Sequence, residues 1–229
     1  MIFELGKEIA FPPPAYAEPD GLLAIGGDLN IDRLLTAYSS GIFPWFNPDD
    51  PILWWSPDPR PIFIPGQIRV TKSLRKTINK NTFKITIDKA FKDVLEGCAK
   101  TPRRGETATW LTEEMKEAYT HLHLHGYAHS VEAWQKNELV GGLYGISMGK
   151  AFFGESMFHK VTDASKVAFY FLSEFLAQQH FLFIDGQVTN PHLLSLGAIE
   201  VSREEYLLRL HKAMKFPTER GIWKEGISF

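Results

Sequence analysis

The sequence predicts an α+β fold in two parts, a small N-terminal domain over residues 1–62 and a larger domain over residues 63–229. Two observations lead to this division. The first sixty residues are rich in proline, glycine and aromatic side chains, whereas alternating strand and helix patterns begin near Pro61. A chain of 229 residues is also long enough for one large domain, or for a large and a small one.

Composition narrows the class of protein and its compartment. The chain has one cysteine, so no disulfide can form within it, which is typical of a reducing cytoplasm. That residue, Cys98, lies in an apolar helical pattern and is expected in the core. The N-terminus lacks the basic and apolar regions of a signal peptide, and no apolar run approaches membrane-spanning length. We therefore expect a cytoplasmic monomer with no membrane partner.

The clearest element of the first part is a helix that begins after Asp28 or Asn30. Either side chain can accept a hydrogen bond from a backbone N–H of the first turn. Gly41 provides a stop signal. Between these limits runs an apolar stripe at helical spacing, made of Ile31, Leu34, Leu35 and Tyr38.

An aromatic segment follows, with GIFPWF at residues 41–46 and LWWSPDPR at residues 53–60. Its prolines exclude a long helix or a central strand, so its rings are expected on a rigid, irregular surface. Flat rings held in this way suit stacking on a nucleobase. The alternative is that the rings pack one domain onto another, which is the commoner role of buried aromatics.

The larger part alternates strands and helices. We expect strands over residues 83–88, 128–135, 139–148, 151–158 and 181–188. We expect helices over residues 90–100, from the Thr112 cap to Gly126, over 164–176, and after the capping box of Ser202 and Glu205. Glycines inside a strand mark places where another group approaches the backbone closely, and the third of these strands contains Gly141, Gly142 and Gly145.

Polar residues in and after the last, apolar strand are the candidates for chemistry. Asp185 and Gln187 are two residues apart, so they would share one face of that strand. Glu155 interrupts a neighbouring strand in the same way, and Asn190 lies just beyond the strand end. Two carboxylates and an amide facing one cavity can grip and orient an amine. The alternative, left open by the sequence, is that Asp185 and Gln187 cap turns or pair with a Lys or Arg elsewhere.

A run of basic residues lies before the strand expected over residues 83–88. Net charge is −2, so the whole chain does not indicate nucleic-acid binding. Several members of the run are three or four residues apart, as on one helix face, and such a stripe can hold a phosphate backbone. Arg60, Arg103 and Arg104 could extend it. A solvated lysine face is the alternative. The stripe consists of Arg69, Lys72, Arg75, Lys76 and Lys80.

Two other patterns give weaker indications of a functional site. Four histidines, at positions 121, 123, 125 and 129, invite a metal site, but no carboxylate lies at a supporting spacing, so we expect no metal. The segment Gly26-Gly27-Asp28 lacks the lysine and the spacing of a phosphate-binding loop.

Longer phrases carry a resemblance that covers nearly the whole chain. They are DGLLAIGGDL at 20–29, GIFPWF, PILWWSPDPR at 51–60, LVGGLYGISMG at 139–149, FFGESMF at 152–158, and IDGQVTN with HLLSLGA at 184–198. Together they resemble the leucyl/phenylalanyl-tRNA–protein transferases of bacteria. The resemblance implies a small N-terminal domain followed by a GNAT-like (acetyltransferase-like) mixed-sheet domain. The loop at residues 159–163 lacks the Gly-rich, Arg-led turn that holds CoA, so the donor is expected to be aminoacyl-tRNA.

The activity implied by the resemblance is transfer of Leu or Phe, and less well Met, from charged tRNA to proteins or peptides with an N-terminal Arg or Lys, which marks them for the N-degron (N-end rule) degradation pathway. No cofactor is needed, because an aminoacyl ester is already activated.

The resemblance also implies roles for individual residues. Asp185 and Gln187 would activate the acceptor amine, and Glu155 and Asn190 would hold the acceptor peptide. An apolar pocket for the donor side chain would be lined by Leu143, Phe152, Met157, Leu172 and Ile184. The 3′-terminal adenosine would lie near Tyr38, Trp45, Trp110 and Tyr119.

Overall fold

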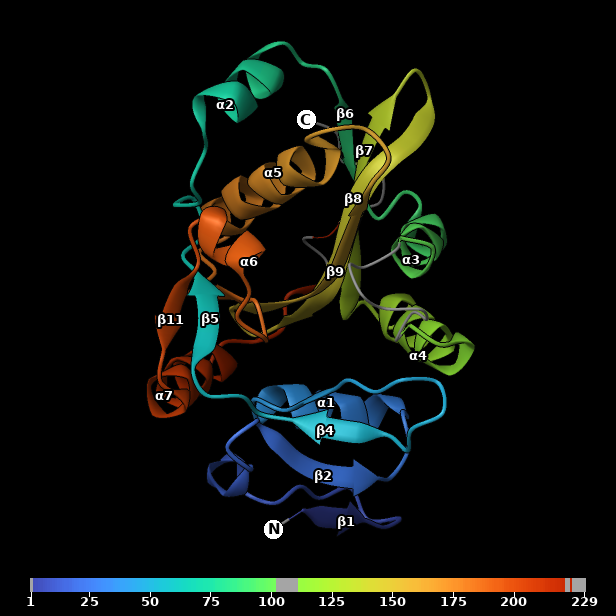
Figure 1. The fold of residues 1–229 in the computed structure, drawn as a ribbon, viewed down its shortest axis with the longest axis vertical. Coiled ribbons are helices and arrows are strands. Elements are labelled where there is room, and N and C mark those ends of the chain that lie inside the picture. The colour runs from blue at the N-terminus through green and yellow to red at the C-terminus, as the bar shows by residue number, and fades with distance from the viewer. Residues whose placement is uncertain (1, 102–110, 221–222, 224–229) are drawn as a thin grey trace.

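The computed structural model describes residues 2–101, 111–220 and 223, whose strands form two mixed sheets (Figure 1). The smaller sheet has the order β1-β2-β4-β3, with β1 parallel to β2 and the other pairs antiparallel. Its strands are β1 (Phe3–Leu5), β2 (Leu22–Gly26), β3 (Phe43–Pro44) and β4 (Leu53–Trp55).

Helix α1 (Ile31–Ser39) lies between the smaller sheet and the rest of the molecule (Figure 1). Its cap is Asn30, whose Oδ1 accepts a hydrogen bond from Arg33 N at 2.9 Å. After the helix, Gly41 has φ +79°, a backbone conformation that favours glycine. The predicted helix is therefore confirmed. A short 3-10 helix, η1 (Pro14–Tyr16), precedes it.

The larger sheet has the order β11-β5-β10-β9-β8-β7-β6. Strand β10 runs parallel to β9, and the other pairs are antiparallel. Its strands are β5 (Arg60–Phe63), β6 (Lys84–Ile87), β7 (Ala128–Gln135), β8 (Glu138–Met148), β9 (Ala151–His159), β10 (Phe183–Asp185) and β11 (Ile199–Val201).

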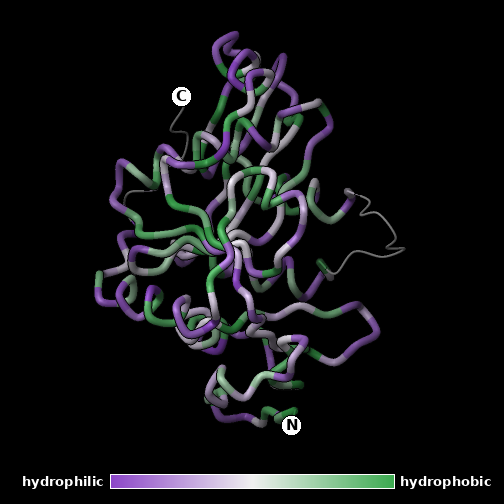
Figure 2. Tube along the Cα trace, turned by 60° about the vertical axis from the view of Figure 1, so that its left-hand side comes forward, coloured by the Kyte–Doolittle hydropathy of each residue, from purple (hydrophilic) through white to green (hydrophobic). Residues whose placement is uncertain are grey.

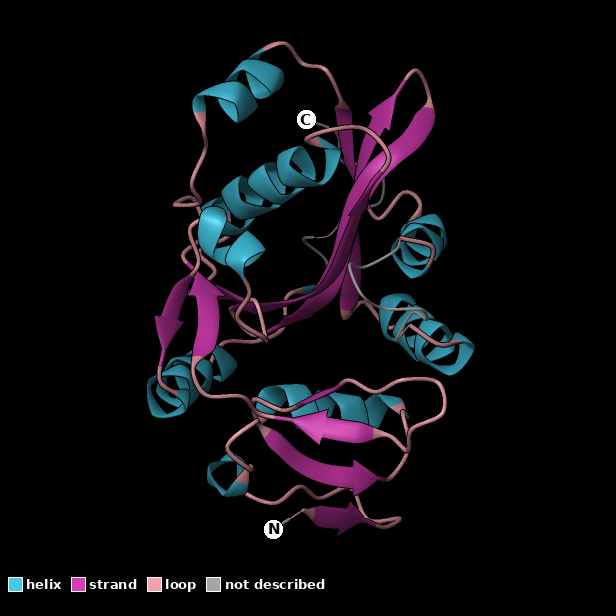
Figure 3. Cartoon of the chain, viewed as in Figure 1, coloured by secondary structure: helices cyan, strands magenta, loops and turns pink. Residues whose placement is uncertain are grey.

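Helices cover both faces of this sheet (Figure 3). Helices α3 (Phe91–Ala99) and α4 (Glu113–Leu124) lie on one face, and α5 (Ala164–Gln178) lies on the other. Cys98 is buried in α3 as expected. The remaining helices are α2 (Lys72–Asn79), α6 (Pro191–Ser195) and α7 (Arg203–Met214). Hydrophilic residues colour most of the outer loops, and hydrophobic residues colour much of the interior (Figure 2).

The glycines of β8 are close-approach positions, as predicted. A Cβ on Gly145 would lie 2.2 Å from the carbonyl oxygen of Phe153, and one on Gly142 would lie 2.8 Å from that of Val131. The pairing of β8 with β9 shifts register between Tyr144 and Gly145. A larger residue at position 145 would therefore push β8 and β9 apart.

Two expectations need correction. The strand predicted over 181–188 is shorter, because β10 ends at Asp185 and Gln187 adopts φ +62° in the turn that follows. Asp185 and Gln187 therefore do not share a strand face, and that prediction is wrong. The larger sheet also begins before residue 63, because β5 already includes Arg60.

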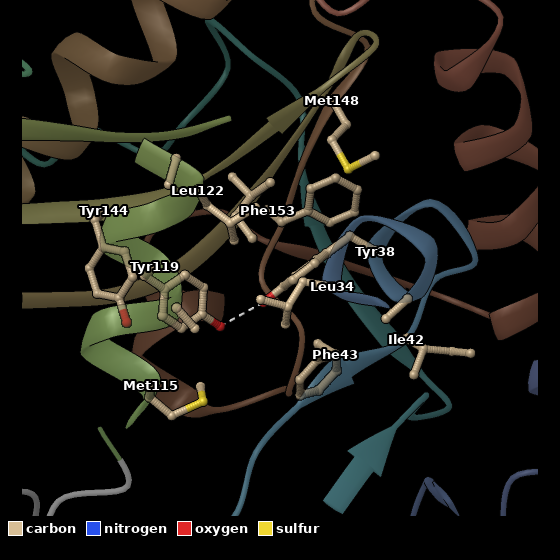
Figure 4. Close-up of a cluster of buried hydrophobic side chains, with 14 of the residues drawn as sticks. Leu34, Tyr38, Ile42, Phe43, Met115, Tyr119, Leu122, Tyr144, Met148 and Phe153 are labelled. Carbon is tan, nitrogen blue, oxygen red and sulfur yellow. Dashed lines mark hydrogen bonds between the residues drawn. The ribbon is translucent and has the colours of Figure 1, made fainter. Parts of the chain in front are cut away.

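The two sheets are joined by one apolar cluster. Tyr38 of α1 packs in it with Tyr119 of α4 and Phe153 of β9 (Figure 4). All three side chains are almost fully buried, with exposed fractions of 1% or less. No helix in the described part of the chain is long and apolar enough to cross a membrane.

Candidate active site

A cavity of about 900 Å³ opens where β9 and β10 separate. The two strands pair only from Ala151 with Phe183 to Asp185 with Phe153. Beyond that point β9 continues to His159, while the chain after β10 turns away into α6. The cavity is lined by the end of the β9–β10 ladder, by the continuing half of β9 and by this turn.

The wall of the cavity is largely apolar. All five residues expected to form a side-chain pocket line it, namely Leu143, Phe152, Met157, Leu172 and Ile184. Phe43, Phe63 and Phe169 line it as well, and they come from β3, β5 and α5. Sequence reasoning missed these three because their periodicity is equally typical of ordinary core residues.

The polar end of the cavity carries Glu155, Asp185, Gln187 and Asn190, so the structure brings together all four predicted polar residues. Asn190 is exposed, and its Oδ1 accepts a hydrogen bond from Leu193 N at 3.0 Å, which caps α6. The turn itself is tight, since a Cβ on Gly186 would lie 2.9 Å from Leu193 Cδ1. These contacts fix where the turn presents its side chains.

Asp185 is fully buried and paired with Arg60. The Arg60 Nε donates to Oδ1 at 2.9 Å and Nη2 donates to Oδ2 at 2.7 Å. Tyr206 OH adds a hydrogen bond to Oδ2 at 2.8 Å, and the backbone N of Gln187 adds one to Oδ1 at 2.8 Å. This is the arginine pairing that the sequence left open. Arg60, 1% exposed, therefore does not extend the basic stripe, which corrects that expectation.

Neither partner of Asp185 was identified from the sequence. Arg60 ends the phrase PDPR. Its place between two prolines, directly after an aromatic segment, is the one sequence feature that could have indicated a buried arginine. Its guanidinium lies over the rings of Phe43 and Tyr206, at 4.8 and 4.5 Å from their centroids. Nothing in the sequence next to Tyr206 indicates its contact with Asp185.

Glu155 faces the cavity from β9 and has no basic partner among the described residues. The hydroxyls of Tyr38 and Tyr119 lie 2.6 Å from its Oε1 and 2.8 Å from its Oε2, and Gln187 Nε2 donates to Oε1 at 2.7 Å. Burial raises the pKa of Glu155 to about 7, against these hydrogen bonds, which lower it. A carboxyl in this range can exchange a proton near neutral pH.

The aromatic residues expected near an adenosine fall in different places. Tyr38 and Tyr119 are buried with their hydroxyls 2.7 Å apart, so their ring faces are not available for stacking on a base, and a nearby adenosine stays a prediction (Figure 4). Trp45 is 36% exposed, lines the cavity, and lies beside Trp55 with ring centroids 5.8 Å apart. Trp110 lies outside the described residues.

The basic stripe lies on and beside α2. All five members are exposed, namely Arg69, Lys72, Arg75, Lys76 and Lys80. Arg103 and Arg104, which could extend it, lie outside the described residues. The Arg75 guanidinium lies 5.5 Å from the ring centroid of Tyr170, which holds α2 against α5. The structure thus confirms a solvent-facing basic helix, a property that both interpretations of the stripe share.

A carboxylate does approach two of the four histidines, contrary to the expectation from spacing. Asp88, His123 and His129 offer ligand atoms within 4.8 Å of one another. Those atoms already have partners: His129 Nδ1 lies 2.7 Å from Asp88 Oδ2, its Nε2 lies 3.2 Å from Gly126 O, and His123 Nδ1 lies 2.8 Å from Ala128 O. Hydrogen bonding between β7 and its neighbours accounts for this cluster.

Taken together, the site is an apolar cavity with one polar end and one exposed aromatic residue at its rim. The apolar wall suits a hydrophobic side chain, and the polar end offers amide and carboxyl groups to an amine. The exposed indole of Trp45 offers a flat surface.

Comparison with known proteins gives the family. A family model described as leucyl/phenylalanyl-tRNA protein transferase matches residues 62–211, and one described as the N-terminal domain of that transferase matches residues 27–58. The leucyl/phenylalanyl-tRNA–protein transferase of Solidesulfovibrio magneticus is 54% identical over 222 residues, which cover 97% of this chain and 90% of that protein. The one of Desulfatibacillum aliphaticivorans is 53% identical over 222 residues, which cover 97% of this chain and 95% of that protein.

Among solved structures, L-PGS from Bacillus licheniformis is similar over 90% of this chain and 66% of that chain, with 8% identity and a TM-score of 0.41. The two family models and the relatives are enough to assign the family. This chain belongs to the leucyl/phenylalanyl-tRNA protein transferase family.

Proposed function

We propose that this protein transfers Leu or Phe, and Met less well, from aminoacyl-tRNA to the N-terminus of proteins that begin with Arg or Lys. The product then enters the N-end rule degradation pathway of the cytoplasm. Family membership supports the reaction class. The observation that carries the proposal is the cavity of about 900 Å³, whose apolar wall ends at Glu155, Gln187 and Asn190.

The apolar wall would hold the donor side chain. Leu143, Phe152 and Ile184 are each 3% exposed or less, so their shape is set by the packed core behind them. A pocket of this kind separates hydrophobic side chains by shape, at roughly 1–3 kcal/mol per methylene. The pocket would therefore select among Leu, Phe and Met by the space that its wall leaves.

The polar end would receive the acceptor. In the reaction the acceptor nitrogen bonds to the ester carbonyl carbon, and the bond from that carbon to the ribose oxygen breaks. The nitrogen loses a proton and the ribose oxygen gains one, so no cofactor is consumed. Gln187 would touch the amine. Glu155 and Asn190 would hold the basic acceptor residue.

Asp185 would act through Gln187 rather than on the amine. The side chain of Asp185 is fully buried, and both of its oxygens already accept hydrogen bonds from Arg60, Tyr206 and the backbone N of Gln187. Gln187 needs φ +62°, which is uncommon for a residue with a side chain, and the bond to Asp185 helps to hold it there. Correct placement of an attacking amine can contribute much of the rate in such a reaction.

The nucleic acid would be held at the rim and on the basic stripe. We assign Trp45 and Trp110 to stacking on the 3′-terminal adenosine, with Trp45 supported by its exposure at the cavity. Arg69, Lys72, Arg75, Lys76 and Lys80 would contact the phosphate backbone without reading sequence.

For the fold, we propose a small N-terminal domain followed by a GNAT-like domain, acting as a monomer. The antiparallel run β7-β8-β9, then α5, then the parallel strand β10 supports this assignment. The division would fall between Trp55 and Arg60, where the chain passes from one sheet to the other, slightly before the expected 62–63 boundary.

A mass-spectrometric assay tests the function. The protein is mixed with Phe-charged tRNA and a peptide that begins with Arg, and the peptide is expected to gain one phenylalanine. An N-acetylated copy of the peptide and uncharged tRNA are the controls. Binding without extension would instead support a tRNA- or peptide-binding module, and binding of CoA by calorimetry would support an acyl-CoA enzyme.

A further inference from the structure

Three contacts among four oxygen atoms close a ring that includes the carboxyl group of Glu155, beneath the cavity. Its Oε1 lies 2.6 Å from the Tyr38 hydroxyl, that hydroxyl lies 2.7 Å from the Tyr119 hydroxyl, and the Tyr119 hydroxyl lies 2.8 Å from Oε2. Each separation is that of an O–H···O hydrogen bond. Each of the three contacts therefore needs one proton of its own.

The two tyrosines supply only two of these protons. Burial, and after it the negative charge that Glu155 would carry, raise the pKa of Tyr38 and Tyr119 well above the usual value, so both phenols keep their single proton. Gln187 Nε2 donates to Oε1 from outside the ring, so its protons do not help. If Glu155 were ionised, one oxygen–oxygen contact of 2.6–2.8 Å would join lone pairs with no hydrogen between them.

A neutral Glu155 completes the ring. Oε1 accepts from Gln187, so the carboxyl proton belongs on Oε2 and points at Tyr119. Tyr119 then donates to Tyr38, and Tyr38 donates to Oε1. Every O–H donor of the three side chains then has an acceptor, and each of the three contacts has its own proton.

The surroundings favour the neutral form as well. The ionisable groups that act on Glu155 are Tyr38 of α1, Tyr119 of α4 and Asp185 of β10. None of these three is basic, and the charge of Asp185 opposes a second negative charge nearby. His192 of α6 lines the same cavity, and burial lowers the pKa of its imidazole. Arg60 is committed to Asp185.

Another buried carboxyl, Glu132 of β7, shows the contrast. It accepts hydrogen bonds from Thr86 and Ser130 and from the backbone N–H groups of Lys89 and Ala90. All four partners donate and no ring is closed, so an ionised Glu132 leaves no contact without a proton, although burial raises the pKa of this carboxyl as well. The need for a third proton is thus specific to the ring at Glu155.

We propose that Glu155 carries a proton while the cavity is empty and releases it when the cationic side chain of an acceptor's N-terminal Arg or Lys binds, with Tyr38 and Tyr119 as the positioning residues that couple the two events. The proposal rests on the proposed function. On release the O–H bond of Oε2 breaks, the proton leaves to the buffer, and both tyrosines donate to the carboxylate. The contact between the two hydroxyls then opens, and the carboxylate pairs with the acceptor's positive charge.

This coupling would make charge a condition of acceptor binding. A neutral residue of similar shape, such as citrulline in place of arginine, cannot offset the burial of an ionised carboxyl. It would leave the proton on Glu155 and meet a carboxyl that offers it no charge.

Infrared difference spectroscopy of the free protein tests the proton directly. At pH 6, wild type minus Glu155→Gln should show the carbonyl stretch of a protonated carboxyl, with a shift in D2O. Tyr38→Phe should keep the band but move it to higher frequency, because the carbonyl no longer accepts a hydrogen bond from that hydroxyl. Glu132→Gln and Tyr170→Phe are the matched controls and should leave the band unchanged. Absence of the band in wild type would overturn the proposal.

Calorimetry tests the coupling. At pH 6, a peptide that begins with Arg should release about one proton per binding event, measured in two buffers of different ionisation enthalpy. The citrulline peptide and the Glu155→Gln variant should release none. Proton release by Glu155→Gln equal to that of wild type would refute the coupling. A band without peptide transfer would count against the proposed function alone, and transfer without a band would count against this inference alone.

Discussion

Two carboxyl groups meet at the polar end of the cavity, the buried Asp185 and the partly buried Glu155, and their partners differ in one respect. Asp185 is fully buried against the guanidinium of Arg60 and accepts four hydrogen bonds. Glu155 has two tyrosines and an amide but no cation among the residues that the structure describes. Gln187 touches both, through its backbone N and its side chain.

The difference separates a structural anion from a group that can exchange a proton. A buried carboxylate with a bidentate arginine holds its charge and its place. A buried carboxyl without a cation has its pKa raised, here to about 7. Groups of one chemical type can thus be given different tasks by their neighbours.

The largest expected effect comes from breaking the ion pair. Asp185→Asn leaves the Arg60 guanidinium buried without an anion, which should lower the free energy of unfolding by about 3–5 kcal/mol. Urea unfolding followed by circular dichroism measures this change. The double variant Arg60→Met, Asp185→Asn should recover part of this stability, because no unpaired charge remains. An unchanged unfolding midpoint in Asp185→Asn, together with abolished transfer, would make Asp185 a purely chemical group.

The next effect is a pH dependence of stability that belongs to Glu155. Its pKa rises on folding from 4.5 to about 7, so between these values the folded state holds more protons than the unfolded chain. Stability from this group is therefore greatest at low pH and falls as pH rises through that window, by about 3 kcal/mol at most.

Urea unfolding of wild type and Glu155→Gln from pH 5 to 8 checks this sign. As the pH increases, the free energy of unfolding of wild type should fall relative to that of Glu155→Gln. Glu200→Gln, which changes an exposed carboxyl, is the control and should run parallel to wild type. Parallel curves for wild type and Glu155→Gln would show that folding does not raise the pKa of Glu155.

A smaller effect concerns the apolar wall. Leu143→Phe puts a larger side chain in the cavity wall and leaves less space for the donor side chain. It should lower transfer of Phe relative to Leu by roughly tenfold or more. The ratio of kcat/KM for the two charged tRNAs measures it. Leu208→Phe makes the same change on the surface, where the residue is 60% exposed, and should leave the ratio alone. Equal decreases for Leu and Phe would mean that Leu143 does not shape the pocket.

The smallest effect per residue is expected on the basic stripe, far from both carboxyls. Replacing Lys72, Arg75 and Lys76 by Ala should flatten the plot of log affinity for tRNA against log salt, by roughly 0.9 for each phosphate that the protein no longer neutralises. Filter binding from about 50 to about 200 mM salt measures the slope. Removing the same charge elsewhere, with Ala at Lys7, Lys212 and Lys215, is the control. A slope equal to wild type would remove the stripe from the tRNA site.

Local parts of the fold and site could be predicted from the sequence, and long-range pairings could not. Helix caps at Asn30 and Thr112 are formed by hydrogen bonds over three residues, which spacing reveals. The pocket residues were predicted through the family phrases that contain most of them. Arg60 meets Asp185 across 125 residues and Tyr38 meets Glu155 across 117, and no local pattern records either contact.

Gln187 shows a second limit. Strand alternation predicted its direction correctly for an extended chain, but β10 ends two residues earlier. The left-handed backbone at Gln187 depends on the bond to Asp185 and on the tight packing of Gly186, both of which exist only in the folded protein.

The passage between the two sheets has a consequence for how a substrate enters. Only residues 56–59 separate β4 from β5, and both ends of this strap are pinned. Ser56 N donates to Gly21 O at 2.8 Å and Arg203 Nε donates to Ser56 O at 2.8 Å, while Arg60 is fixed to Asp185. The apolar cluster around Tyr38 also holds the two sheets together in this structure. An RNA end of the kind proposed to bind at Trp45, which lines the cavity, would therefore reach the cavity past that indole without any separation of the two sheets.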